Sequence, residues 1–321
     1  MDATWQWRGY GTEVGRELFG RRLTHIAFAD DVTLVARSWV SLKRMIALLR
    51  DALKRRGLDL HPSKCKVQTN MPTLNPRGNI AVDDALSVNL LPEGDGLEIL
   101  GTILALKDCT AVEIRNRVAV GWRRFWSLKL LVQNRSTSLK KRLKLFDATI
   151  GSSVLWCCQS WTPRSDDLAV LRTARNAMLR RICDFRRRPD EDWLDWMKRA
   201  TQRARNAANK AGIREWVQAH AAQKWSWAGH VGRRASTTWL WRVTSWRDSE
   251  WGVTVSSLGC ERPLRPSRRR WMKWEDALRR YCEVNDLGAW IRFATNKPTW
   301  MQWQSGFAEW FSGVCVRPAT I

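Results

Sequence analysis

The sequence lacks three features that would place the protein outside the cell or in a membrane. No apolar run approaches the roughly 20 residues that cross a bilayer, and the N-terminus has no charged-then-apolar signal segment. None of the eight cysteines is spaced as Cys-x-x-Cys, and no cysteine–histidine cluster matches a zinc finger or knuckle. We therefore expect an intracellular protein, cytoplasmic or nuclear and not secreted, whose thiols are reduced and buried.

Acidic residues are also scarce, since 31 Asp and Glu stand against 55 Lys and Arg, for a net charge of +24. Residues 1–100 carry 14 basic and 12 acidic side chains, whereas residues 101–321 carry 41 and 19. Such an excess favours a polyanionic partner, most simply nucleic acid, with an affinity that falls as salt rises. An anionic membrane surface is the competing partner, but no basic amphipathic helix stands apart, and we expect no membrane contact.

Tryptophan, by contrast, is abundant. The chain has 22 tryptophans, of which 19 follow residue 100. Most should pack between helices, and a minority beside arginines could stack on nucleobases. With 321 residues, 44% of them hydrophobic, the chain is large enough for one large domain or two ordinary ones.

Two β-prone runs meet at a pair of adjacent carboxylates, Asp30 and Asp31. Residues 23–28 and 32–37 alternate with a period of two and are rich in β-branched and aromatic side chains, which predicts a hairpin with acid at its tip. Adjacent carboxylates repel each other unless a cation neutralises them, and hard oxygen ligands suit Mg²⁺. The alternative is an ordinary tight turn, in which aspartate is common.

The run Phe28-Ala29-Asp30-Asp31, followed by Val32-x-Leu34-x-Ala36-x-Ser38, resembles the Phe-Ala-Asp-Asp box of reverse transcriptases of the non-LTR retrotransposon (LINE-like) family. In that family the box is the palm hairpin that carries catalytic aspartates. The resemblance implies that Asp30 and Asp31 are catalytic metal ligands for Mg²⁺, with Asp30 the better ligand, in nucleotidyl transfer by two metal ions.

Residues 57–67, Gly-Leu-Asp-Leu-His-Pro-Ser-Lys-Cys-Lys-Val, resemble the family segment Gly-Leu-x-Leu-Asn-x-x-Lys-Thr-Lys-Val. Lys64 falls on the family's lysine, which is thought to neutralise or protonate the leaving pyrophosphate. His61 and Cys65 depart from the family's Asn and Thr. The alternative for Lys64 is a solvated loop lysine.

Residues 97–103, Leu-Glu-Ile-Leu-Gly-Thr-Ile, resemble the family's Tyr-Leu-Gly strand, so Leu100 and Gly101 are predicted to lie on a strand against the primer end. Between these segments, apolar spacing predicts a helix that begins at Ser38 or Ser41 and stops at Gly57. Residues 71–96, which contain a second acidic pair at 83–84, predict a surface hairpin without catalytic acids.

From Thr110 the apolar period changes to 3.6 residues and predicts a basic helical bundle. In a polymerase this is the position of the thumb, which grips the duplex backbone without sequence preference. Several segments between Trp122 and Ile182 also resemble this part of the family. The side chains assigned to nucleic-acid binding here are Arg123, Arg124, Lys140 and Lys141.

Residues 186–190 read as a linker, after which residues 193–232 are helical in pattern. The run from Trp225 to Arg233 resembles the family's Trp-x-Gly-His-x-x-Arg element. His230 within it could bind a metal, but without clustered cysteines or histidines a hydrogen-bonded structural role is favoured. Residues 262–271 resemble a later Arg-Pro-Arg-Arg-Trp element, whose Arg269, Arg270 and Trp271 could grip a phosphate backbone and stack on a base, or form a solvated basic turn.

The predicted fold class is α+β. Residues 1–108 are predicted to form a partial polymerase palm of antiparallel hairpin plus helix, residues 109–185 a helical thumb, and residues 186–321 a basic, Trp-rich helical region. The resemblance covers roughly residues 18–275 and omits the fingers and the first palm strand with its aspartate, for which residues 1–22 hold no equivalent.

Three hypotheses follow from the sequence. In the first, the chain is the C-terminal portion of a LINE-like reverse transcriptase, an RNA-directed DNA polymerase that is inactive by itself and whose partners are an RNA template and a DNA primer or duplex. In the second, it is a non-enzymatic nucleic-acid-binding protein in which the aspartate pair is a relict. In the third, it is an unstable retroelement remnant.

Overall fold

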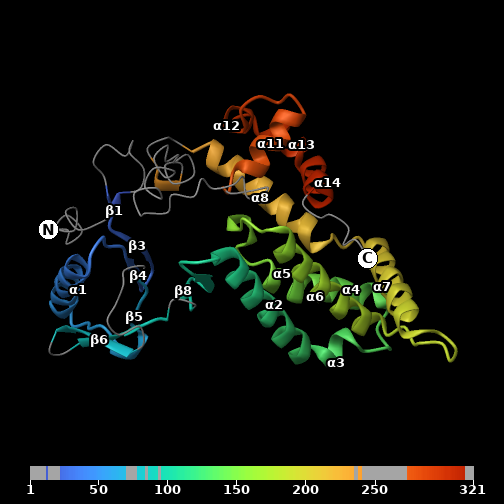
Figure 1. The fold of residues 1–321 in the computed structure, drawn as a ribbon, viewed down its shortest axis with the longest axis horizontal. Helices are drawn as coiled ribbons and strands as arrows, with labels where there is room; N and C mark the ends of the chain where they lie inside the picture. The colour runs from blue at the N-terminus through green and yellow to red at the C-terminus, as the bar shows by residue number, and fades with distance from the viewer. Residues whose placement is uncertain are drawn as a thin grey trace, which may run out of the picture. The chain divides into compact units, whose positions relative to one another are not determined.

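The computed structural model describes residues 12–13, 22–69, 78–83, 86–92, 95–234, 238–240 and 273–314. The chain divides into two units. The first, here the strand-bearing unit, comprises Met1–Cys109 and Arg234–Arg265, and the second, the helical unit, comprises Thr110–Arg233 and Pro266–Ile321. Figure 1 shows short strands and a helix, α1, in the first and helices throughout the described part of the second, which is the α+β class that the sequence predicts.

The described residues of the strand-bearing unit form four small sheets. Strands β1 (Thr12–Glu13) and β2 (Arg22–Leu23) pair antiparallel, as do β3 (His25–Phe28) with β4 (Asp31–Leu34), and β8 (Leu97–Ile99) with β9 (Thr102–Leu104). The three-stranded sheet has the order β5 (Lys66–Val67), β7 (Leu86–Leu90), β6 (Gly78–Asp83), with β5 parallel to β7 and β6 antiparallel to it.

Helix α1 (Trp39–Lys54) forms where the apolar spacing predicts it. The Ser38 hydroxyl accepts a hydrogen bond from the Ser41 backbone N–H at 3.1 Å, which satisfies one of the free donors at the first turn. Met45 and Ile46 are buried, and Gly57 adopts a φ of +72° just beyond the helix. The predicted start, apolar face and stop of this helix are confirmed.

The core of this unit lies between α1 and the three-stranded sheet. Ile46 of α1 packs with Val82, Leu86 and Val88, and Leu34 of β4 packs against the same cluster. In β7, buried Leu86, Val88 and Leu90 alternate with exposed Ser87 and Asn89. The predicted hairpin over residues 71–96 therefore exists as β6 and β7, but one of its faces contributes to the core, and Asp84 lies outside the described residues.

The helical unit begins with α2 (Cys109–Ser127), α3 (Lys129–Val132) and α4 (Leu139–Phe146). A π-helical turn over Asp147–Gly151 leads into α5 (Ser152–Val154), and a 3₁₀ turn over Cys158–Ser160 precedes α6 (Ser165–Cys183). The apolar stripes predicted from spacing are buried here at Ile114, Phe125, Leu143, Phe146 and Ile150. Residues 193–232 form two helices, α7 (Trp193–Lys210) and α8 (Trp216–Gly232), which are separated at Gly212 with a φ of +76°.

Four shorter helices complete the described part of this unit: α11 (Asp276–Val284), α12 (Trp290–Phe293), α13 (Lys297–Gln302) and α14 (Gln304–Val314). Helices α11, α13 and α14 pack on α8 through aromatic rings. Trp225 of α8 and Trp300 of α13 stack with ring centroids 3.8 Å apart and planes 6° apart. Each indole N–H donates to the other residue's backbone carbonyl, at 2.7 Å from Trp225 and 2.9 Å from Trp300.

Gly229 makes this contact possible, because a methyl group at its α-carbon would lie 2.5 Å from Nε1 of Trp300. Four residues on, Arg233 donates from Nη1 to the Ala294 carbonyl at 3.0 Å. The residues that resemble the Trp-x-Gly-His-x-x-Arg element therefore join α8 to the segment that carries α12 and α13.

We expect Gly229→Ala to lower the free energy of unfolding by about 1–3 kcal/mol, because the added methyl overpacks a site closed by a rigid indole. Urea denaturation followed by tryptophan fluorescence measures the change. Gly313→Ala is the matched control, since its new methyl meets no atom within 4 Å and replaces glycine within α14. Equal effects of the two substitutions would contradict the packing role of Gly229.

Candidate functional site

The acidic pair lies at the tip of the β3–β4 hairpin, as the sequence predicts. Ala29 and Asp30 form the two-residue turn, and Ala29 has a φ of +52°. Asp31 is the first residue of β4 and lies opposite Phe28. Asp30 and Asp31 are both exposed, so their carboxylates are accessible to a ligand from solvent.

The register decides which side chains share a face with the carboxylate of Asp31. Directly paired residues point to the same side of a hairpin, so Phe28 and Asp31 share one face, on which Ile26 also lies. Phe28 and Ile26 are 65% and 50% exposed. Leu34 lies on the opposite face and packs against the core.

The described residues contain no group of three or more His, Cys, Asp or Glu side chains that could hold a metal ion. Two adjacent carboxylates supply oxygen ligands of the kind that Mg²⁺ takes, but a centre that bridges two metal ions requires further carboxylate ligands. The pair by itself therefore does not fit a complete two-metal centre.

Lys64 ends a 3₁₀ turn over Pro62–Lys64 and is exposed. The two departures from the family segment have local explanations. His61 Nδ1 lies 3.0 Å from the Ser63 hydroxyl within the turn. Cys65 packs against the core cluster, and burial raises the pKa of its thiol. Lys64 is thus presented to solvent by a turn whose next residue is fixed in the core.

Leu100 and Gly101 do not lie on a strand. They form the turn between β8 and β9, with φ values of +49° and +75°. Positive φ at both central residues suits a two-residue hairpin, whose twist then matches that of its strands. The prediction that these two residues belong to a strand is wrong, because the Ile99↔Thr102 pair closes the hairpin around them.

The basic side chains assigned to nucleic-acid binding divide into two groups. Arg123 and Arg124 on α2, and Lys140 and Lys141 on α4, are exposed. Arg269, Arg270 and Trp271 lie outside the described residues. The exposed set has the charge and accessibility that phosphate contacts require.

Other arginines of the same helices are structural. Arg117 donates from Nε to Glu113 Oε1 at 2.6 Å in a buried pair one turn apart. Arg142 donates from Nη1 to the Ile182 carbonyl at 2.6 Å and joins α4 to α6. The sequence pattern does not distinguish these buried arginines from the exposed ones.

A tryptophan–arginine cluster lies beside the exposed basic residues of α2. Trp122 and Trp126 stack with centroids 6.0 Å apart, and the Arg181 guanidinium lies 5.1 Å and 5.9 Å from their ring centroids. Trp126 is 49% exposed. It is an example of the tryptophan–arginine neighbours that the sequence suggests as a base-stacking surface.

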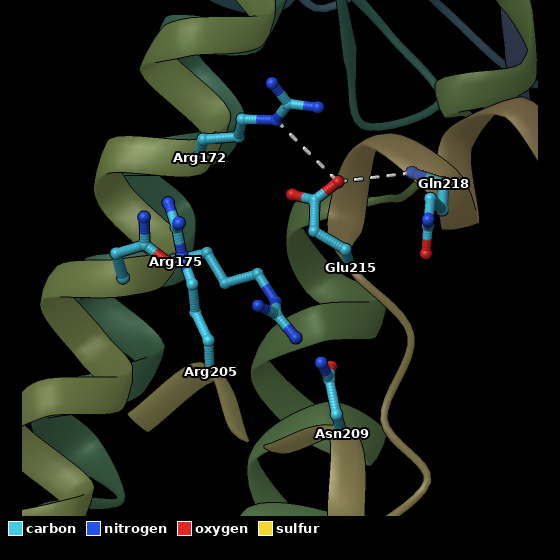
Figure 2. Close-up of a pocket in the computed structure, with 7 residues that line it drawn as sticks. Arg172, Arg175, Arg205, Asn209, Glu215 and Gln218 are labelled. Carbon is cyan, nitrogen blue, oxygen red and sulfur yellow. Dashed lines mark hydrogen bonds and ion pairs between the residues drawn. The ribbon is translucent and has the colours of Figure 1, made fainter. Parts of the chain in front are cut away.

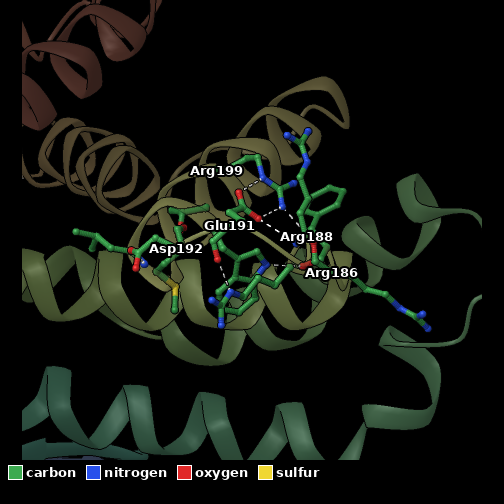
Figure 3. A network of polar contacts seen from close by, with 11 residues as sticks. Arg186, Arg188, Glu191, Asp192 and Arg199 are labelled. Atoms are coloured by element: carbon green, nitrogen blue, oxygen red, sulfur yellow. Dashed lines mark hydrogen bonds and ion pairs between the residues drawn. The ribbon is translucent and has the colours of Figure 1, made fainter.

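The predicted linker at residues 186–190 is held by a polar network that Figure 3 shows. Arg199 of α7 binds Glu191 through both carboxylate oxygens at 2.6 Å, and the hydrogen bond holds the pKa of Glu191 down at about 2. Arg199 also donates to the Arg186 carbonyl at 3.1 Å, and Arg188 donates its backbone N–H to Glu191. The linker's exposed arginines are therefore displayed on an ordered loop.

Two histidines of α8 lie against aromatic rings. His230, the candidate from the sequence, is half-buried and stacks on Trp227 with centroids 5.2 Å apart. His220, which the sequence reasoning passed over, is fully buried between Trp161 and Phe311. Its only sequence signal is its position among the small and apolar residues of α8.

The surroundings of His220 suppress its chemistry. Within the described chain neither ring nitrogen has a hydrogen-bond partner of normal geometry. Burial first, and then the charge of Lys224, lower the pKa of His220 to about 3, although the nearby Cys158 backbone opposes this. Burial likewise raises the pKa of the Cys158 thiol to about 12. This cluster is therefore a neutral packing element and does not form a cysteine–histidine nucleophile.

We expect His220 to make the free energy of unfolding decrease at acidic pH. Its pKa in the folded state lies below the unfolded value of about 6.5, so the unfolded chain binds more protons between about pH 3 and pH 6.5. Stability is then lost as pH falls through this window, by up to about 1.4 kcal/mol per pH unit. His220→Phe, which keeps the ring contacts, should lose less stability than wild type between pH 7 and pH 4 in urea denaturation. Equal slopes for the two proteins would contradict this assignment.

Comparison with known proteins gives one informative similarity. The chain is 23% identical over 287 residues to a Caenorhabditis elegans protein described as an uncharacterized transposon-derived protein, covering 88% of this chain and 95% of the relative. No family model matches the chain, and no solved structure matches it. No helix in the described ranges is long and apolar enough to span a membrane. The similarity supports a transposon-derived origin for the chain.

Proposed function

We propose that this chain is part of the reverse transcriptase of a LINE-like retroelement and that its helical unit binds the backbone of an RNA template paired with a DNA primer. The observation that carries the proposal is the β3–β4 hairpin, which places Asp30 in its turn and Asp31 at the first position of the following strand. The transposon-derived relative, matched over most of both chains, supports a transposon-derived origin.

The chemistry of the complete protein is nucleotidyl transfer assisted by Mg²⁺. Asp30 and Asp31 would supply oxygen ligands to Mg²⁺, which would provide charge stabilisation for the transfer, and a further carboxylate would be needed to complete a two-metal ligand set. Lys64, exposed on its 3₁₀ turn, is suited to neutralise the charge of the leaving pyrophosphate. Leu100, at the tip of the β8–β9 turn, would approach the primer end through a turn and not through a strand face.

Binding is assigned to the exposed cations of α2 and α4. Arg123, Arg124, Lys140 and Lys141 can each contact a phosphate without reading sequence. Trp126, exposed beside Arg181, offers a flat ring to an unpaired base at the end of a duplex.

A second candidate is a non-enzymatic nucleic-acid-binding protein derived from such an element. It is favoured by the incomplete ligand set at the hairpin tip, where no third acidic or histidine group joins the pair in the described ranges. The two candidates share the binding surface and differ in whether Asp30 contributes to substrate binding through a metal ion.

The binding surface is tested with Arg123→Gln/Arg124→Gln. This double variant should bind a primed RNA–DNA duplex more weakly, and the slope of log affinity against log salt should fall by about 1–2, since each phosphate contact contributes about 0.9. Arg279→Gln/Arg280→Gln, which removes two exposed cations of α11, is the matched control and should leave the slope unchanged. Absence of binding to RNA and DNA at low salt would exclude both candidate functions.

The role of the acidic pair is tested by titrating Mg²⁺ into the same binding assay. If Asp30 contributes to duplex binding through a metal ion, Mg²⁺ should strengthen binding. Asp30→Asn should then abolish this dependence on Mg²⁺. Binding that is indifferent to Mg²⁺ and to Asp30→Asn supports the non-enzymatic candidate.

Primer extension on a primed RNA template should give no incorporation with this chain alone, because the pair lacks a further carboxylate within the described residues. Incorporation that Asp30→Asn abolishes would show instead that the catalytic ligand set is complete.

A further inference from the structure

We propose that a pocket between α6, α7 and the start of α8 binds a phosphate group. The pocket has a volume of about 300 Å³, at the lower end of the range for small-molecule sites. Figure 2 shows the side chains that line it: Arg172, Arg175, Asn176, Arg205, Asn209, Glu215 and Gln218. The lining comprises three guanidinium groups, three side-chain amides and one carboxylate, so positive charge and hydrogen-bond donors predominate.

Arg175 is the strongest indication that a ligand belongs there. It is 2% exposed, and its Nε has no hydrogen-bond partner among the residues that the structure describes. Its Nη2 donates to the Arg214 carbonyl at 3.3 Å, which holds the guanidinium in place. Its Nε–H remains without an acceptor in the described part of the chain. A buried cation with an unused donor is costly unless a further acceptor completes its shell.

The carboxylates at hand do not balance the arginines. Glu215 lies 4.0 Å from Arg172, and its Oε2 accepts from the backbone N–H of Val217 at the start of α8. Burial lowers the pKa of Arg175, Glu215 and Asp147 raise it, and Arg205 lowers it again. Even with Asp147 counted, three guanidinium groups face two carboxylates, one of which is committed to capping a helix.

The remaining lining residues prepare the site for an anion with several oxygens. Arg205 Nε donates to Asn176 Oδ1 at 3.2 Å, which fixes its guanidinium while leaving other N–H groups available. Arginine forks match the oxygens of phosphate with two parallel hydrogen bonds. A phosphate group would therefore neutralise the excess positive charge of the pocket lining.

The phosphate can come from a free phosphorylated ligand or from a nucleic-acid backbone, and the proposal does not depend on the polymerase-derived function. Sequence reasoning missed the site because Arg172, Arg175, Arg205 and Glu215 are spread over 43 positions of helical sequence and converge only through helix packing.

The test is calorimetric titration of the full chain with pyrophosphate at constant ionic strength, followed by titration with a short single-stranded oligonucleotide without terminal phosphates. Arg205 is exposed, so Arg205→Gln should be tolerated by the fold. It should lower the affinity for whichever probe occupies the pocket by about tenfold or more. Arg280→Gln on α11 removes an exposed arginine away from the pocket and should leave both affinities unchanged. Arg175→Met should abolish binding, with circular dichroism to verify folding.

Pyrophosphate binding lost in Arg205→Gln identifies a free phosphorylated ligand, even if no nucleic acid binds and the proposed function fails. Oligonucleotide binding weakened by Arg205→Gln, without pyrophosphate binding, identifies a backbone phosphate. The inference is overturned if neither probe binds, or if every probe that binds does so equally well to wild type and Arg205→Gln. Equal binding of nucleic acid to the two proteins leaves the proposed function intact.

Discussion

The face-to-face contact of Trp225 with Trp300 is the constraint on which the C-terminal part of the helical unit depends. Two indoles at 3.8 Å with reciprocal bonds to each other's backbone fix both the distance and the rotation of the segments that carry them. Gly229 is required because no side chain fits beneath the ring. The abundance of tryptophan is explained here by packing: large rings supply core area, and their single N–H donors find backbone acceptors.

Arginine serves two purposes in this strongly basic chain. Arg142 and Arg233 donate to backbone carbonyls across helix contacts and act as cross-links. Arg123 and Arg124 lie in solvent, where their charge produces a long-range field that attracts polyanions. Net charge therefore overstates the number of cations that can contact a partner, because part of it is used to satisfy carbonyls at helix contacts. Arg175 lies between the two groups, since it is buried and only partly bonded.

Local patterns in the sequence predicted the features that depend on near neighbours. Helix α1 follows from the Ser38 cap and apolar spacing, and the β3–β4 hairpin follows from alternation around Asp30. The turn at Leu100 was missed because a two-residue turn leaves the apolar pattern unbroken. The buried positions of Arg175 and His220 could not be predicted, because the residues around them come from helices distant in sequence. The local sequence pattern does not indicate that either side chain is buried. The role of the hairpin tip stays a prediction for the same reason, since a ligand set is also non-local.

Strand β4 connects the hydrophobic core to the acidic tip of the hairpin, because alternate side chains of a strand point to opposite faces. Leu34 and Asp31 are three positions apart on one strand, and an odd separation sends two side chains to opposite faces. Burial of Leu34 against the cluster around Ile46 thus turns the Asp31 carboxylate outward, beside Phe28. The packing of Leu34 thus sets the direction of the Asp31 carboxylate although the two side chains lie on opposite faces. Substitutions in the core beneath the hairpin can therefore reorient its acidic tip without changing either aspartate.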